Sequence, residues 1–341
     1  MDKKEKLKGI IAGIVTVAVI GFFVWLMMVN LVIGIVVLVF FCSTILGIAL
    51  RKGDKPANKP KKSKTKVEEE IRDKEKLDTI LNEIKKRTEM PYYKISLVEE
   101  PTDIYSSKVG GLPYWDLSKE YPIDCKGNKL ILLAQINFEK ESFNDERLPK
   151  TGMLQFFIAS DETTYGCSFD DVQENWKVVY HNQIMNNITE DEIKAMDIPT
   201  NKTAEYSPMK KEMDAVALKF EKSKCYITTG TYNFENIVKT ILKEKFNEEV
   251  IEKNLYFHFG DPDYEYIMNS FEAFGHKLLG YPDFTQKDIR DEGTRYDTLL
   301  LQIDSDKGIM WGDVGVANFF INSTDLKNKD FSKILYTWDC G

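Results

Sequence analysis

Three aspartates near the end of the chain have types and spacing that could bind a metal ion. Asp304 and Asp306 are two residues apart, so a strand ending there would point both carboxylates to one side. Asp313 follows after a short loop, and oxygen ligands of this kind suit Ca²⁺ or Mg²⁺. The string DSDKG lacks the remaining ligands of an EF-hand. The alternative is that these carboxylates cap turns beside Gly308 and Gly312, and no other cofactor is indicated.

Histidine and cysteine side chains could supply acid–base or nucleophilic chemistry. His276 stands before a Gly-Tyr-Pro turn and could be a general base, although a structural histidine is the alternative. Cys167 or Cys225 could act as a nucleophile only if the fold brings a histidine beside it. The cysteines form no CxxC pair, which predicts free thiols in a reducing compartment.

Two blocks of the sequence repeat the same series of short patterns. In each block a Gly-x-Pro turn precedes a strand ending in Gln-Ile-Asn or Gln-Ile-Asp and then a strand reading Gln/Asn-Phe-Phe-Ile. Two related halves would enclose a cleft, the natural place for a ligand, although chance similarity between short strands is the alternative. We therefore predict a ligand site with the candidate contacts Gln135, Asn137, His276, Gln302, Asp304 and Trp311. We also expect Tyr114, Trp115 and Trp311 to be exposed and to line a groove, unless they serve packing.

Hydrophobic periodicity predicts the elements that position these residues. Helices are expected over 67–89, 234–251 and 264–274, and a capping box at Thr189 and Glu192 predicts another. Strands are expected over 93–98, 130–138, 152–159, 176–181, 215–220, 225–229, 299–304, 317–322 and 334–338. Strands outnumber helices and do not alternate with them. This pattern predicts an α+β fold with mainly antiparallel β-sheets and an internal duplication.

The first fifty residues predict a membrane anchor. Residues 9–50 carry no charge, and a helix of that length would be about 63 Å long, against roughly 30 Å of hydrocarbon. We predict a two-helix transmembrane hairpin with spans at about 9–29 and 31–50 and a turn near Asn30. Lysines and Arg51 flank both ends, which predicts that both termini are cytosolic at the inner membrane. A signal peptide fits the long apolar run poorly.

The first 66 residues and the rest of the chain carry opposite net charges. Residues 1–66 contain twelve Lys or Arg against three Asp or Glu, while residues 67–341 contain 34 against 51. Residues 51–66 are rich in lysine and proline and predict a flexible basic tether. The acidic remainder, 67–341, would repel phosphate, so a nucleic-acid partner is excluded and a basic protein partner is favoured.

The strings SKVGGLPYW, LLAQINF and LPKTGMLQFFI, followed by GHKLLGYPDFTQ and IMWGDVGVANFFI, resemble the YwqG-like family, a bacterial domain of unknown function. The resemblance spans about Ile71 to Gly341 and implies an α+β fold with a duplication, but no activity or catalytic residue. We therefore predict a membrane-anchored cytosolic domain that works as a protein-interaction or immunity-type binding module. The alternative is a small-molecule or metal-dependent enzyme that uses the cleft between the halves.

Overall fold

The structure is a computed structural model that describes residues 73–252, 254–271 and 273–341. These residues belong to one compact unit. The predicted hairpin (9–29 and 31–50) and basic tether (51–66) lie outside the described residues. In the part that is described, no helix combines the length and apolar character needed to cross a membrane.

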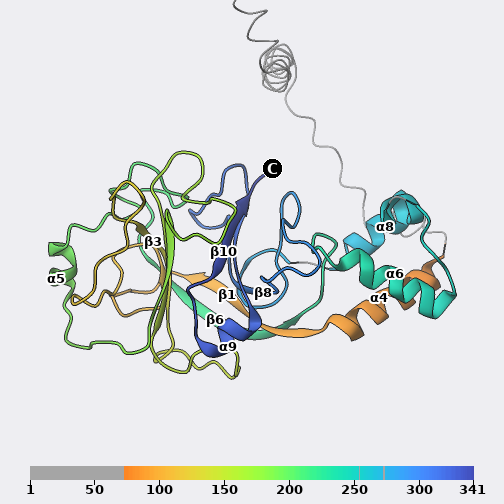
Figure 1. Cartoon of the computed structure of the whole chain (residues 1–341), viewed down its shortest axis with the longest axis horizontal. Helices are drawn as coiled ribbons and strands as arrows, with labels where there is room; N and C mark the ends of the chain where they lie inside the picture. The colour runs from red at the N-terminus through yellow and green to blue at the C-terminus, as the bar shows by residue number, and fades with distance from the viewer. Residues whose placement is uncertain (1–72, 253, 272) are drawn as a thin grey trace, which may run out of the picture. The chain divides into compact units, whose positions relative to one another are not determined.

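Ten strands form one sheet in the order β10-β9-β8-β7-β1-β6-β2-β3-β4-β5 (Figure 1). Neighbouring strands are antiparallel throughout, as predicted. The strands are β1 (Met90–Val98), β2 (Lys108–Val109), β3 (Ile131–Asn137), β4 (Met153–Ile158), β5 (Trp176–His181), β6 (Val216–Cys225), β7 (His276–Leu278), β8 (Thr298–Asp304), β9 (Val316–Ile321) and β10 (Ile334–Asp339).

The strand order has an internal symmetry. Strands β1 and β6 pair at the centre, with β2 to β5 following β6 on one side and β7 to β10 following β1 on the other. The pairing of β3 with β4 shifts between Leu132 and Ala134, and that of β8 with β9 shifts at the matching place, between Leu299 and Leu301. Each half therefore contains five strands in matching order, which agrees with the repeat predicted from the sequence.

The sheet curls until its two edges meet, giving a nearly closed, barrel-like body. Phe156 of β4 contacts Phe319 of β9 at 5.0 Å between ring centroids, and Trp176 of β5 contacts Tyr336 of β10 at 5.6 Å. All four side chains are fully buried in one hydrophobic core shared by both halves. Burial of this aromatic area stabilises the contact between the halves, which the pairing of β1 with β6 also joins.

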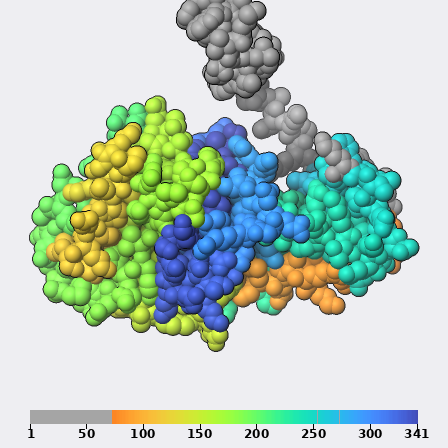
Figure 2. Space-filling view, viewed as in Figure 1, coloured from red at the N-terminus to blue at the C-terminus, as the bar shows by residue number. Residues whose placement is uncertain are grey.

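The helices are few, and α4, α6 and α8 gather on one side of the β-rich body (Figure 1), where they form a lobe in the space-filling view (Figure 2). Helices α4 and α6 contact each other, and α4 also contacts α8. A second hydrophobic core, built around Leu77, Ile80 and Ile84 of α4 and Val238 and Ile241 of α6, holds this lobe together. The helices are α4 (Lys74–Thr88), α5 (Glu190–Ala195), α6 (Phe234–Phe246), α7 (Leu255–Phe259), α8 (Asp261–Met268) and α9 (Ser323–Asn328).

Several predicted boundaries were wrong for identifiable reasons. The strand expected at 215–220 continues to Cys225 as β6, because its exposed lysine-rich part still pairs with β1, and the strand expected at 225–229 is not formed: residues 226–229 are not in a strand. The helix expected over 234–251 ends at Phe246, where Asn247 adopts the left-handed conformation of a helix C-cap. The helix expected over 264–274 is α8, which begins after Gly260. The capping box of α5 is confirmed.

Candidate functional site

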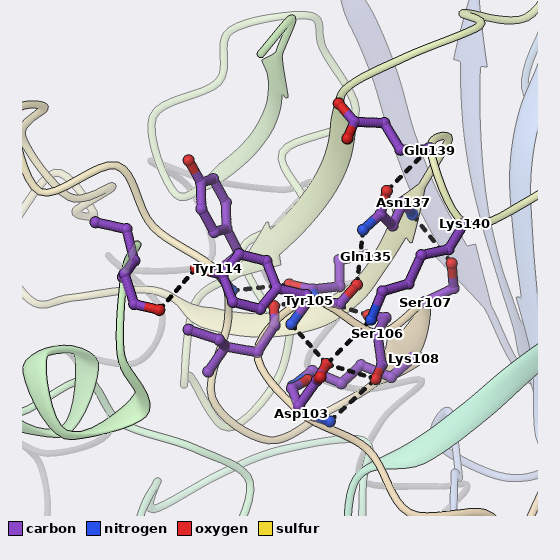
Figure 3. A network of polar contacts seen from close by, with 12 residues as sticks. Asp103, Tyr105, Ser106, Ser107, Lys108, Tyr114, Gln135, Asn137, Glu139 and Lys140 are labelled. Atoms are coloured by element: carbon purple, nitrogen blue, oxygen red, sulfur yellow. Dashed lines mark hydrogen bonds and ion pairs between the residues drawn. The ribbon is translucent and has the colours of Figure 1, made fainter. Parts of the chain in front are cut away.

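Gln135 of β3 holds the loop that carries the first Gly-x-Pro turn (Figure 3). Its Nε2 donates to the carbonyls of Ile104 and Ser106, both at 2.8 Å. Its Oε1 accepts from the backbone N–H of Tyr114 and from Nε2 of Gln155, both at 3.1 Å. Gln135 is fully buried, so the amide uses all of its hydrogen-bonding capacity inside the protein.

Gln302 of β8 makes three corresponding bonds in the second half. Its Nε2 donates to the carbonyls of Ala273 and Gly275 at 2.9 and 2.7 Å, and its Oε1 accepts from the backbone N–H of Asp283 at 2.7 Å. Gln302 is also fully buried. The two predicted ligand contacts therefore stand in matching places, where each fastens a loop to the sheet.

Beside each of these two glutamines lies a buried lysine that the sequence analysis did not single out. Lys108 of β2 pairs with Gln135, and Lys277 of β7 pairs with Gln302. Each ammonium group donates to backbone carbonyls, that of Asp103 for Lys108 and those of Ala273 and Tyr281 for Lys277. Burial lowers the pKa of both lysines to about 8. The sequence could have indicated these lysines, because a lysine stands three residues before the Gly-x-Pro turn in both blocks.

Asn137 and Asp304 follow the two glutamines and also bond within the fold. The backbone N–H of Asn137 donates to Oγ of Ser107 at 3.0 Å, and its Nδ2 donates to the carbonyl of Tyr105 at 2.8 Å (Figure 3). The backbone N–H of Asp304 donates to Nδ1 of His276 at 3.0 Å. Ser107 and His276 thus accept a hydrogen bond from the backbone N–H at matching positions in the two halves.

His276 is a buried neutral histidine. Because Nδ1 accepts from the backbone, Nε2 carries the proton, and it lies 3.8 Å from the carboxylate of Asp306. Burial lowers the pKa of His276, and the carboxylates of Asp304 and Asp306 oppose that effect in part. The structure thus brings together three of the predicted residues, with His276 placed between two acidic neighbours.

The predicted metal ligands do not converge. The carboxylate of Asp304 accepts from the backbone N–H groups of Gly275 and Ser305, whereas that of Asp306 faces His276. Within the described ranges, no group of three or more His, Cys, Asp or Glu residues, Asp313 included, is placed to hold a metal ion. The arrangement favours the alternative in which the carboxylates cap turns.

The aromatic residues expected at a groove are buried, so that expectation was wrong. Tyr114 and Trp311 are fully buried and Trp115 is 2% exposed. Trp115 packs edge-on against Tyr121 and Phe157, because a loop without secondary structure needs large side chains to attach it to the sheet. These residues position the loops and do not line an open surface.

The first half contains a polar chain that the sequence analysis missed. Gln155 of β4 donates from Nε2 to the carbonyl of Tyr114 and meets Nε2 of His181 at 3.0 Å through its Oε1. His181 is fully buried between Tyr114 and Trp115, and burial lowers its pKa to about 4. His181 is thus a neutral N–H donor to Gln155.

A hollow of about 740 Å³ opens where β1 ends, β6 begins and the loop after β8 arrives. We call it the acidic hollow. Its charged lining comprises four carboxylates and two lysines: Glu99, Glu100, Glu212, Asp214, Lys210 and Lys307. It lies at the junction of the halves, where a cleft was predicted. None of the six predicted ligand contacts lines it, since their side chains serve the loops instead.

The carboxylates of the acidic hollow differ in their pairing. Glu100 pairs with Lys219 at 3.0 Å, and Asp214 pairs with Lys202. Glu99 and Glu212 are exposed and form no ion pair with any residue that the structure describes. The lining thus holds four carboxylates against two lysines, and Lys202 and Lys219 pair with two of these carboxylates.

These features define the class of protein: a curled antiparallel sheet built from two repeated five-strand halves, with a small helical lobe. Residues 107–340 match the family model described as Domain of unknown function (DUF1963), so the chain belongs to this family. No curated protein matches the chain.

Proposed function

We propose that this protein is a membrane-anchored interaction module, of the immunity type, that binds a basic segment of a protein partner in the acidic hollow. The observation that carries the proposal is a hollow of about 740 Å³ with two carboxylates, Glu99 and Glu212, that form no ion pair with another described residue. The excess of 51 acidic over 34 basic residues in 67–341 supports the sign of the partner's charge. The resemblance to YwqG-like proteins is compatible with a binding role.

The anchor in this proposal is the uncharged segment 9–50, with both termini and the acidic domain in the cytosol at the inner membrane. Cys125 is an exposed free cysteine and therefore a natural reporter of topology. A membrane-impermeant maleimide should label it only after the cells are permeabilised, and Cys125→Ser should lower the signal to that of the partly exposed Cys340. Labelling in intact cells would refute this orientation.

Binding is tested with a synthetic hexalysine peptide and the full chain in detergent micelles. Replacing Glu99 and Glu212 together by Gln should weaken binding about tenfold at low salt, because each unpaired carboxylate near a cation contributes about 0.5–1 kcal/mol. The matched control replaces the exposed Glu146 and Glu162 by Gln, which keeps the net charge the same as in the test variant. Equal weakening in both variants would show that only overall charge matters and would refute the hollow as the site.

The second hypothesis, an enzyme working between the halves, receives no specific support from the acidic hollow. Among the described residues that line it there is no histidine or cysteine. His276, the predicted general base, is buried under its own hydrogen bond to Asp304. The interaction module is therefore the function that the geometry favours.

A further inference from the structure

The acidic hollow lies where two paired strands separate. β1 and β6 pair without a break from Met90 opposite Cys225 to Val98 opposite Ala217, and the pairing stops there. Residues 99–102, which leave β1, and residues 212–216, which lead into β6, both line the hollow. The backbone of two diverging segments therefore forms part of its wall.

The sequence ends the strand pairing on the β1 side. The backbone N–H of Glu100 turns back to the carbonyl of Val98 at 2.9 Å, and Pro101 has no N–H to donate to a neighbouring strand. The segment that leads into β6 therefore loses its neighbour at this point, although it continues in the opposite direction past the end of β1.

The register of β6 shows which way its backbone groups point. In an antiparallel sheet, successive residues turn their N–H and C=O groups alternately to the strands on either side. The N–H of Leu218 donates to the carbonyl of Ser107, which precedes β2, at 3.0 Å, and Val216 pairs with β2. Ala217 therefore faces β1, and by the same alternation so does Ala215.

Ala215 has no partner on that side. Neither its N–H nor its C=O forms a hydrogen bond with any residue that the structure describes. The position opposite Ala215, two residues beyond Val98, is that of Glu100, whose N–H is already used. Ala215 is half-buried and lines the hollow. An unpaired strand edge of this kind can pair with another extended chain.

A lysine of the protein itself already satisfies a strand carbonyl beside the hollow. Nζ of Lys307, which lines the hollow, donates to the carbonyl of Leu97 in β1 at 2.8 Å. Glu99 and Glu212, in contrast, form no ion pair with any described residue. The hollow thus combines an open backbone edge with carboxylates, which suits a chain that brings both N–H groups and ammonium groups.

We propose that the basic segment of the partner binds in the acidic hollow as an added β-strand, whose backbone exchanges hydrogen bonds with Ala215 while its ammonium groups reach Glu99 and Glu212. This inference rests on the proposed function and adds the conformation of the bound segment. Backbone pairing supplies affinity for any extended chain, and the carboxylates select a basic one. Side chains alternate along a strand, so every second lysine of the segment turns to the same side.

The test compares three hexalysine peptides of equal charge: unmodified, N-methylated at every second residue, and N-methylated at every residue. Binding to the full chain in detergent micelles is measured by isothermal titration calorimetry. Alternate N–H groups of a strand point to opposite edges, so the half-methylated peptide keeps one intact edge and should bind within about twofold of the unmodified peptide. The fully methylated peptide should bind at least about fivefold more weakly.

The outcomes separate this inference from the proposed function. Equal binding of the three peptides, with the loss on replacing Glu99 and Glu212 retained, would overturn the strand pairing and leave the hollow as the binding site. A loss that grows in proportion to the number of methyl groups would also overturn the pairing, because it would show no preferred edge. Failure of unmodified hexalysine to bind would overturn both.

A variant localises the pairing on the protein. Ala215→Pro removes the N–H and should weaken unmodified hexalysine about fivefold, with no effect on the fully methylated peptide. The matched control Asn186→Pro, in an exposed turn, should leave the binding of all three peptides unchanged. Unchanged binding in a folded Ala215→Pro variant would refute the assignment. If that variant does not fold, the peptide comparison decides, since it uses the unchanged protein.

Discussion

Replacing Gln135 or Gln302 by leucine tests the central claim that these two residues fasten the repeated loops to the sheet. Leucine has a similar volume but cannot form hydrogen bonds, so Gln135→Leu removes four hydrogen bonds and Gln302→Leu removes three. With about 1 kcal/mol per bond, the free energy of unfolding should fall by about 4 and about 3 kcal/mol. The backbone groups left unpaired are buried and would add to the loss.

Urea unfolding followed by tryptophan fluorescence gives both free energies, since Trp115, Trp176 and Trp311 lie in the cores. The matched control is Gln183→Leu, at an exposed glutamine, which should change the free energy of unfolding by less than about 0.5 kcal/mol. A loss below about 1 kcal/mol in both buried variants would refute the reasoning. The slope of the free energy of unfolding with urea should be the same in the control as in the unchanged protein, because a lower slope would signal an altered unfolded state.

The buried lysines and the crowded glycines give two further predictions. Because the pKa of Lys108 and Lys277 is lowered from 10.5 to about 8, the unfolded chain binds more protons between these values, and stability should rise as the pH increases from about 8 toward 10. Replacing both lysines by Met should flatten this rise in urea unfolding, whereas replacing the exposed Lys126 should leave it intact; a rise that survives the double replacement would contradict the assignment. Gly152→Ala should lower the thermal midpoint more than Gly127→Ala, since both have positive φ (83° and 86°) but an added Cβ would lie 2.1 Å from a carbonyl oxygen only at Gly152. Equal losses would show that backbone strain alone sets the cost.

Much of the sheet could be predicted because its strands are buried on both faces. β3, β4 and β9 consist of buried residues along their whole length, and such runs stand out from their polar surroundings. β2 and β7 were missed because they are two and three residues long and rely on neighbouring strands for their pairing. Short elements of this kind leave almost no periodic signal.

The positions of the candidate site residues were predicted in part, but the contacts of their side chains were not. The repeat correctly placed Gln135 and Gln302 in matching positions, but a matching position does not tell whether an amide faces a ligand or its own backbone. Their partners are carbonyls from loops that lack a regular pattern, at separations of about thirty residues. The residues that line the acidic hollow were missed for a related reason, since Glu99 and Glu212 come from segments that only the pairing of β1 with β6 brings together.

The two halves differ in how one matching pair of strand positions is hydrogen-bonded. In the first half Gln155 and His181 satisfy each other, so the strand face is closed to a ligand and contributes rigidity. In the second half Asn318 and Asp339 occupy these positions with the opposite balance of donors and acceptors. The hydrophobic core is shared by both halves and holds both in place. The fold therefore tolerates incomplete hydrogen bonding at these positions in one of the two halves. The second half can keep an acceptor, Oδ1 of Asn318, that has no hydrogen-bond partner among the described residues, at a cost of about 1–3 kcal/mol.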